Sequence, residues 1–74
     1  HTLVDFVRQQ LAYEEVPDLL ASAVVALVEH LDERGLLPFP IEALAVELDL
    51  PQALLQEAHD VLRTLEPRGI GARD

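Results

Sequence analysis

Residues 17–35, PDLLASAVVALVEHLDERG, decide the fold that we expect for this chain. Their large apolar residues recur every three or four positions, which is the spacing of one face of a helix: Leu20, Val24, Leu27, Val28 and Leu31. Alanines at positions 21, 23 and 26 widen this stripe. Pro17 suits a first helical turn, and Gly35 suits a left-handed C-cap. The stretch therefore predicts a central helix that is the most buried of the fold and ends at Gly35.

Three further helices follow from the same spacing outside this stretch. Thr2 can cap a first helix that ends near residues 13–15. A short third helix covers about residues 40–48, and Pro51 opens a fourth that stops at Glu66, before a proline. Between the second and third helices, residues 36–40 contain two prolines and read as an apolar connector packed on the helices.

The expected architecture is all-α, because no segment alternates convincingly between apolar and polar residues. We predict a small four-helix bundle whose third and fourth helices have helix-turn-helix proportions. An irregular C-terminal tail follows, with glycines at positions 69 and 71 and no regular pattern.

Length and composition narrow the classes of function. Seventy-four residues make one small domain or a piece of a larger one, with no room for a deep catalytic cleft. Fourteen acids against five arginines and no lysine give a net charge of −9. Such a body repels phosphate and attracts basic protein surfaces. The chain has no cysteine, no signal-peptide pattern and no apolar run long enough to cross a bilayer, so we expect a cytoplasmic module without membrane contact.

Catalytic and metal-binding patterns are scarce. Ser22 is the only serine, and its small neighbours point to a packing role within a helix. His30 and Glu33 could share a face, but no further zinc ligand accompanies them. We therefore expect no enzyme activity, no cofactor and no metal.

Direct DNA binding is also disfavoured. The fourth helix would enter the major groove, and the residues expected to face outward from it are Gln52, Gln56, Glu57, His59, Asp60 and Arg63. Two acids against one arginine have the wrong sign for a groove lined by phosphates.

Three segments together resemble the sigma-54 factors of RNA polymerase. Residues 31–37, LDERGLL, are similar to the LDExGyL segment of that family, with Leu36 in place of the aromatic residue. Residues 41–48, IEALAVEL, resemble its leeiAxeL helix. Residues 62–74, LRTLEPRGIGARD, resemble its lqxLdPxGvGARD signature, with Glu66 for the usual aspartate and Ile70 for the usual valine.

The resemblance covers nearly the whole chain and implies the N-terminal part of the family's core-binding domain. It implies a fragment of a transcription initiation factor that docks onto core RNA polymerase, with the β and β′ subunits as partners. DNA reading and the response to an ATPase activator would belong to other regions of the parent protein. Residues 1–66 would form a helical subdomain, and residues 67–74 a hinge or tail leading to a missing second subdomain. The alternative is a small acidic helical adaptor unrelated to transcription.

Particular residues can be assigned to these roles only as candidates. The candidate polymerase contacts are Glu29, Asp32, Glu33, Glu57, Asp60, Arg68 and Arg73, and the candidate hinge or motif residues are Gly35, Pro67, Gly69 and Gly71. The glycines permit backbone conformations closed to other residues, and the arginines offer forks for carboxylates. Two alternatives stay open for Asp32, which could bond to turn amides or pair with a tail arginine instead of meeting a partner.

Overall fold

The computed structural model describes residues 2–65, which form the expected all-α fold. Its helices are α1 (Leu3–Tyr13), α2 (Asp18–Glu29), α3 (Ile41–Leu48) and α4 (Gln52–Thr64). The hydroxyl of Thr2 accepts a 3.1 Å hydrogen bond from the backbone N–H of Asp5, so the predicted N-cap of the first helix is confirmed. Prolines at positions 17, 40 and 51 stand directly before the other three helices.

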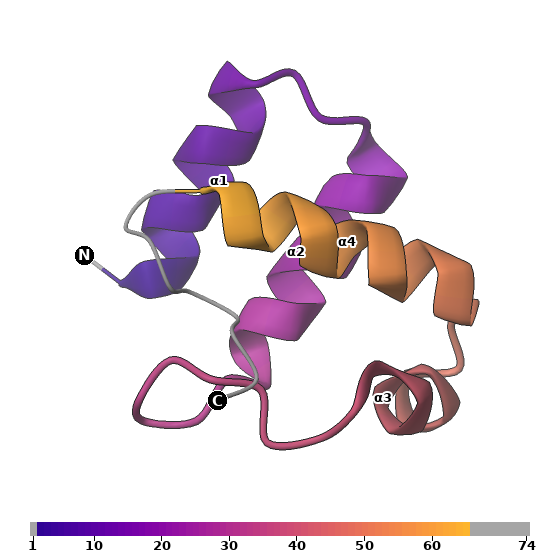
Figure 1. Cartoon of the computed structure of the whole chain (residues 1–74). Coiled ribbons are helices and arrows are strands. Elements are labelled where there is room, and N and C mark those ends of the chain that lie inside the picture. The colour runs from indigo at the N-terminus through magenta and orange to yellow at the C-terminus, as the bar shows by residue number, and fades with distance from the viewer. Residues whose placement is uncertain (1, 66–74) are drawn as a thin grey trace.

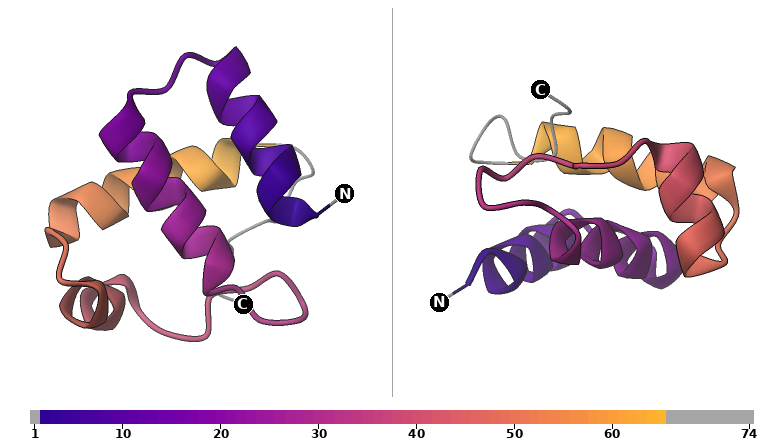
Figure 2. Two further views of the ribbon diagram at one scale, coloured as in Figure 1. Left: turned by 180° about the vertical axis from the view of Figure 1, so that it is seen from behind. Right: turned by 90° about the horizontal axis from the view of Figure 1, so that it is seen from below.

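The helices are arranged in two layers (Figure 1). Helices α1 and α2 form one layer, and α4 lies across them in the other, as the right-hand view of Figure 2 shows. Helix α2 contacts both α1 and α4, whereas α3 packs against α4 at the edge of the structure. This confirms the central position predicted for the second helix.

An aliphatic core fills the space between the layers. Its fully covered large side chains are Leu27, Leu44, Leu55, Leu62, Val7 and Val24. They come from all four helices, so no helix buries its apolar stripe without the others. Burial of such side chains is the main source of stability in a chain with no disulfide.

The end of α2 differs from the sequence-based prediction. The helix stops at Glu29, and the N–H groups of His30 and Leu31 donate to Leu27 and Val28, the tighter three-residue spacing of a helix end. Gly35 does adopt the left-handed conformation, with φ +80°, but it does so in a separate turn five residues after the cap. The prediction that Gly35 caps this helix was therefore wrong, because apolar spacing cannot distinguish a last helical turn from the turn after it.

Two other helices end with non-glycine residues in the left-handed region. Glu15 follows α1 with φ 57°, and Asp49 caps α3 with φ 55°. In both places the next residue, Val16 or Leu50, donates its N–H back to the last helical turn and packs partly buried against the core. The apolar contact holds the chain in a conformation that its side chains disfavour.

The connector between α2 and α3 packs on the helices through part of its length. Leu37 is buried, with 3% of its surface exposed, and Phe39 is 49% exposed. The expected apolar connector is thus anchored by one leucine, and its aromatic side chain lies at the surface. Within residues 2–65, none of the helices has the length and apolar character needed to cross a membrane.

Candidate protein-docking surface

The turn after α2 is organised by Asp32. Oδ1 of Asp32 accepts hydrogen bonds from the backbone N–H groups of Arg34 (2.8 Å) and Leu36 (3.0 Å). The N–H of Asp32 donates to the carbonyl of Leu36 at 2.8 Å, and the N–H of Gly35 donates to the carbonyl of Asp32 at 2.9 Å. The structure shows Asp32 bound to turn amides, one of the two alternatives left open by the sequence, and the tail arginines of the other alternative lie outside the described residues.

These contacts also change the acidity of Asp32. The hydrogen bond from the Leu36 N–H is the largest cause that lowers the pKa of Asp32 below its ordinary value. The N–H and the charge of Arg34 lower it further, while partial burial acts in the opposite direction. The guanidinium of Arg34 lies 3.8 Å from Oδ2. Asp32 is therefore a negatively charged centre of a turn, with one of its oxygens already used inside the chain.

His30 ties this turn region to α3. Its Nδ1 donates to the carbonyl of Ala26 at 2.8 Å, because a carbonyl oxygen can only accept. Its Nε2 lies 3.8 Å from Oε2 of Glu47 on α3. In the sequence, His30 and Glu33 could share a face, but too few ligands accompany them to predict a metal site. Within the described part of the chain, no group of three potential ligands is placed to hold a metal ion.

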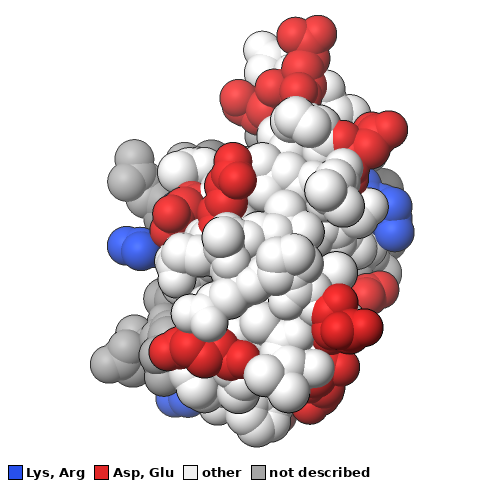
Figure 3. Space-filling view, turned by 90° about the vertical axis from the view of Figure 1, so that its right-hand side faces the viewer, with Lys and Arg blue, Asp and Glu red and all other residues white. Residues whose placement is uncertain are grey.

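The four other acidic candidates in the described region are exposed and fall into two groups. Glu29 and Glu33 lie at the end of α2 and in the turn after it. Glu57 and Asp60 lie one helical turn apart on α4, where Gln56 donates to Asp60 at 3.4 Å. Figure 3 shows acidic groups around an uncharged centre on one side of the molecule, with basic side chains only near its margins.

One of the residues predicted to lie on the outer side of α4 is buried in the structure. His59 was expected to point outward, yet it is 7% exposed and lies on the buried side with Leu55, Ala58 and Leu62. A polar residue beside an apolar stripe carries no signal that separates the inner from the outer position. The tail candidates Arg68, Arg73, Pro67, Gly69 and Gly71 lie outside the described residues.

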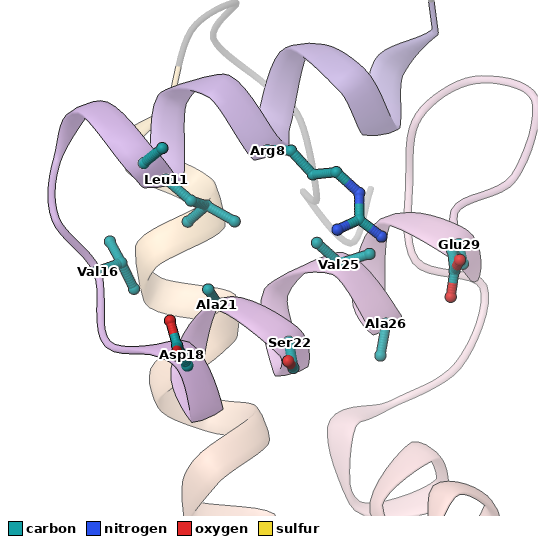
Figure 4. Close-up of a pocket in the computed structure, with 10 residues that line it drawn as sticks. Arg8, Leu11, Val16, Asp18, Ala21, Ser22, Val25, Ala26 and Glu29 are labelled. Carbon is teal, nitrogen blue, oxygen red and sulfur yellow. The ribbon is translucent and has the colours of Figure 1, made fainter.

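A groove between α1 and α2 was not predicted from the sequence. It has a volume of about 640 Å³, and Figure 4 shows the side chains that line it: Arg8, Leu11, Ala12, Val16, Asp18, Ala21, Ser22, Val25, Ala26 and Glu29. The row of small residues on α2 is the feature of the sequence that could have indicated this groove. Ala21 and Ala26 were assigned to the core stripe, but they lie at this groove and are only partly buried.

The family can be decided by comparison with known proteins. A family model described as "Sigma-54 factor, core binding domain" matches residues 1–74. The chain belongs to the sigma-54 core-binding-domain family. A Clostridium kluyveri protein whose name describes it as an RNA polymerase sigma-54 factor is 27% identical over 73 residues. That match covers 99% of this chain and 16% of the relative, so the chain spans about a sixth of the relative's length.

No solved structure was found to match this chain. The sigma-54 core-binding family is one of transcription-factor domains, not of enzymes. The resemblance read from residues 31–37, 41–48 and 62–74 is thus confirmed at the level of the family. In the first of these segments, the aspartate and the glycine have structural roles in one turn.

Proposed function

We propose that this chain docks a sigma-54 factor onto core RNA polymerase. The observation that carries the proposal is the match of residues 1–74 to the core-binding domain of that family. The contacts would be made with the β and β′ subunits, in the cytoplasm. Promoter reading and the response to an ATPase activator would belong to other regions of the parent protein.

The charge of the described region supports a protein partner over a nucleic acid. Residues 2–65 carry twelve acids and three arginines, a net charge of −9. On α4, the exposed Glu57 and Asp60 would repel phosphates and attract lysine or arginine side chains. We propose Glu29, Glu33, Glu57 and Asp60 as direct contacts.

Two other sets of residues would act less directly. Asp32 would position the turn that presents Glu33, since Oδ1 is bound to the turn amides. Residues 67–74 would form the hinge to a second subdomain, with Arg68 and Arg73 available to carboxylates of either the factor or polymerase.

Binding of the 74-residue chain to purified core RNA polymerase across a salt series tests this function. We expect saturable binding that a full-length sigma-54 factor displaces and that weakens as salt rises. Circular dichroism of the same sample shows whether the chain is helical. A helical chain that shows no binding would contradict the proposal. Duplex DNA serves as the second ligand, and salt-sensitive DNA binding by this chain would favour nucleic-acid recognition instead.

A further inference from the structure

The groove between α1 and α2 opens on a side that the rest of the described chain leaves uncovered. On α2, the groove residues Ser22 and Glu29 lie almost half a turn around the helix from Leu27, which is fully buried in the core. Helix α4 covers one side of α2 (Figure 2), and apolar or small residues of α2 also line the groove on the other side (Figure 4). One of those sides has no covering element within residues 2–65.

The shape of the groove suits a helix. Among its lining residues, Leu11 and Val25 are buried and Ala21 is partly buried, so they form the floor, whereas the small residues Ala12 and Ser22 are exposed at the rims. Small side chains on the rims let the backbone of a third helix approach closely. The lining residues of α2 run over the whole helix, from Asp18 to Glu29, so an occupant of about three turns, roughly 16–18 Å long, would match its length.

Apolar surface continues beyond the groove along α2. Leu19 is 69% exposed and lies one turn before Ser22 on the same side of the helix. A leucine exposed to this extent contributes little to the stability of the chain itself. Next to an uncovered groove, it extends the apolar surface that a partner can bury.

The charged residues at the groove indicate which charge a partner should carry. Asp18 and Glu29 lie at opposite ends of α2, about 16 Å apart along its axis, and both are exposed. Arg8 is the basic residue of the lining and projects from α1 between these ends (Figure 4). With the net charge of −9 over residues 2–65, this arrangement favours basic groups at both ends of the occupant.

We infer that the α1–α2 groove binds an amphipathic helix of core RNA polymerase, with an apolar side seated on the floor and lysine or arginine at either end. This inference rests on the proposed function and deepens it by naming the docking site and the kind of element that it accepts.

The test is binding of the 74-residue chain to core RNA polymerase with a variant that fills the groove. Ser22→Trp places a bulky ring over the floor at an exposed position, and Ala43→Trp makes a similar change at an exposed position of α3. We expect Ser22→Trp to weaken binding by about tenfold or more and Ala43→Trp to leave it within about twofold. Thermal unfolding and circular dichroism of both variants establish that they remain folded.

A second readout does not depend on polymerase. A synthetic helical peptide of about 12 residues, with leucines on one side and lysines at both ends, is titrated into the isotope-labelled chain. We expect backbone amide shifts to change along α1 and α2, centred on Ser22 and Val25, and to be lost in Ser22→Trp. Glu29→Lys should weaken binding of the peptide, and the loss of affinity should be larger at low salt than at high salt.

The outcomes separate the two proposals. If the wild-type chain binds polymerase and Ser22→Trp binds equally well, the groove is not the docking site, although the proposed function stands. If the wild-type chain does not bind polymerase, the proposed function fails, and with it polymerase as the source of the helix. Peptide shifts on other faces, or none, would overturn the groove as a site for basic helices.

Discussion

Asp32 and Leu36 are joined by two hydrogen bonds that close the turn after α2. The N–H of Asp32 donates to the carbonyl of Leu36 at 2.8 Å, and the N–H of Leu36 donates to Oδ1 of Asp32 at 3.0 Å. Between them, the N–H of Arg34 donates to the same carboxylate oxygen. The family-like segment 31–37 is therefore a compact turn that delivers Leu37 to the core. The carboxylate of Asp32 accepts hydrogen bonds from two backbone N–H groups of this turn, which lie beyond the end of α2 and outside its own hydrogen bonding.

Replacing Asp32 should open this turn. In Asp32→Ala, the N–H groups of Arg34 and Leu36 lose their acceptor, and Leu37 is less firmly held. We expect a lower midpoint of thermal unfolding, measured by circular dichroism. Glu33→Ala is the matched control, because Glu33 is the adjacent exposed acid and no hydrogen bond of its side chain is seen in the described structure. Equal midpoints for the two variants would show that the turn does not depend on the carboxylate.

The same carboxylate should make stability depend on pH. Its pKa is lower in the folded chain, so the unfolded chain binds more protons in the acidic range and stability rises with pH there. The contribution is complete above the unfolded value of about 3.9 and is lost as pH falls through the folded value. Urea unfolding at a series of pH values should show the gap between wild type and Asp32→Asn narrowing below pH ~4. A gap that stays constant down to pH ~2 would contradict this assignment.

Substitution of Gly35 should lower the stability of the chain because of its backbone conformation and not because of a clash with neighbouring residues. Its φ is +80°, and a Cβ added there would meet nothing within 4 Å. We expect Gly35→Ala to cost about 1–2 kcal/mol of unfolding free energy, the price of a left-handed conformation. Gly35→Asn should cost less, because asparagine tolerates this region better. If chemical denaturation shows the two variants to be equally stable, backbone conformation is not the cause.

The two sides of α2 offer a matched pair of leucines. Leu27 is fully buried between the layers, and Leu19 on the same helix is 69% exposed. Leu27→Ala should lower the unfolding free energy by about 2–5 kcal/mol, since it removes a buried side chain and leaves a cavity. Leu19→Ala should change it by less than about 0.5 kcal/mol. Chemical denaturation of both variants checks this, and a large loss in Leu19→Ala would mean that this side of the helix is covered.

The exposed acids of α4 should contribute to the rate and salt dependence of polymerase binding. Glu57→Lys should weaken binding a few-fold at low ionic strength, with the difference shrinking as salt rises. Glu42→Lys changes the net charge equally at an exposed position of α3 and serves as the control. Surface plasmon resonance across a salt series measures both. An equal loss in the two variants would indicate a general charge effect instead of a contact at Glu57.

The sequence by itself determined the helical class, the order of the helices and most of their bounds. Each helix has its own local signals, such as Thr2 at the first N-cap and prolines at positions 17, 40 and 51, and these act over a few residues. Hydrogen bonding of Asp32 to turn amides could be given as one of two alternatives for the same reason, because its partners lie two and four residues away. The sigma-54 resemblance was likewise readable, since it is carried by contiguous segments.

Only the tertiary structure decided which sides of the helices meet. Periodicity shows that α2 is apolar or small nearly all round, but not that α4 covers the side with Leu27 and leaves the side with Ser22 open. The burial of His59 and the approach of His30 to Glu47 likewise depend on elements distant in the chain. Such contacts arise when helices pack, and packing is set by the combined shape of all four helices, which no local pattern contains.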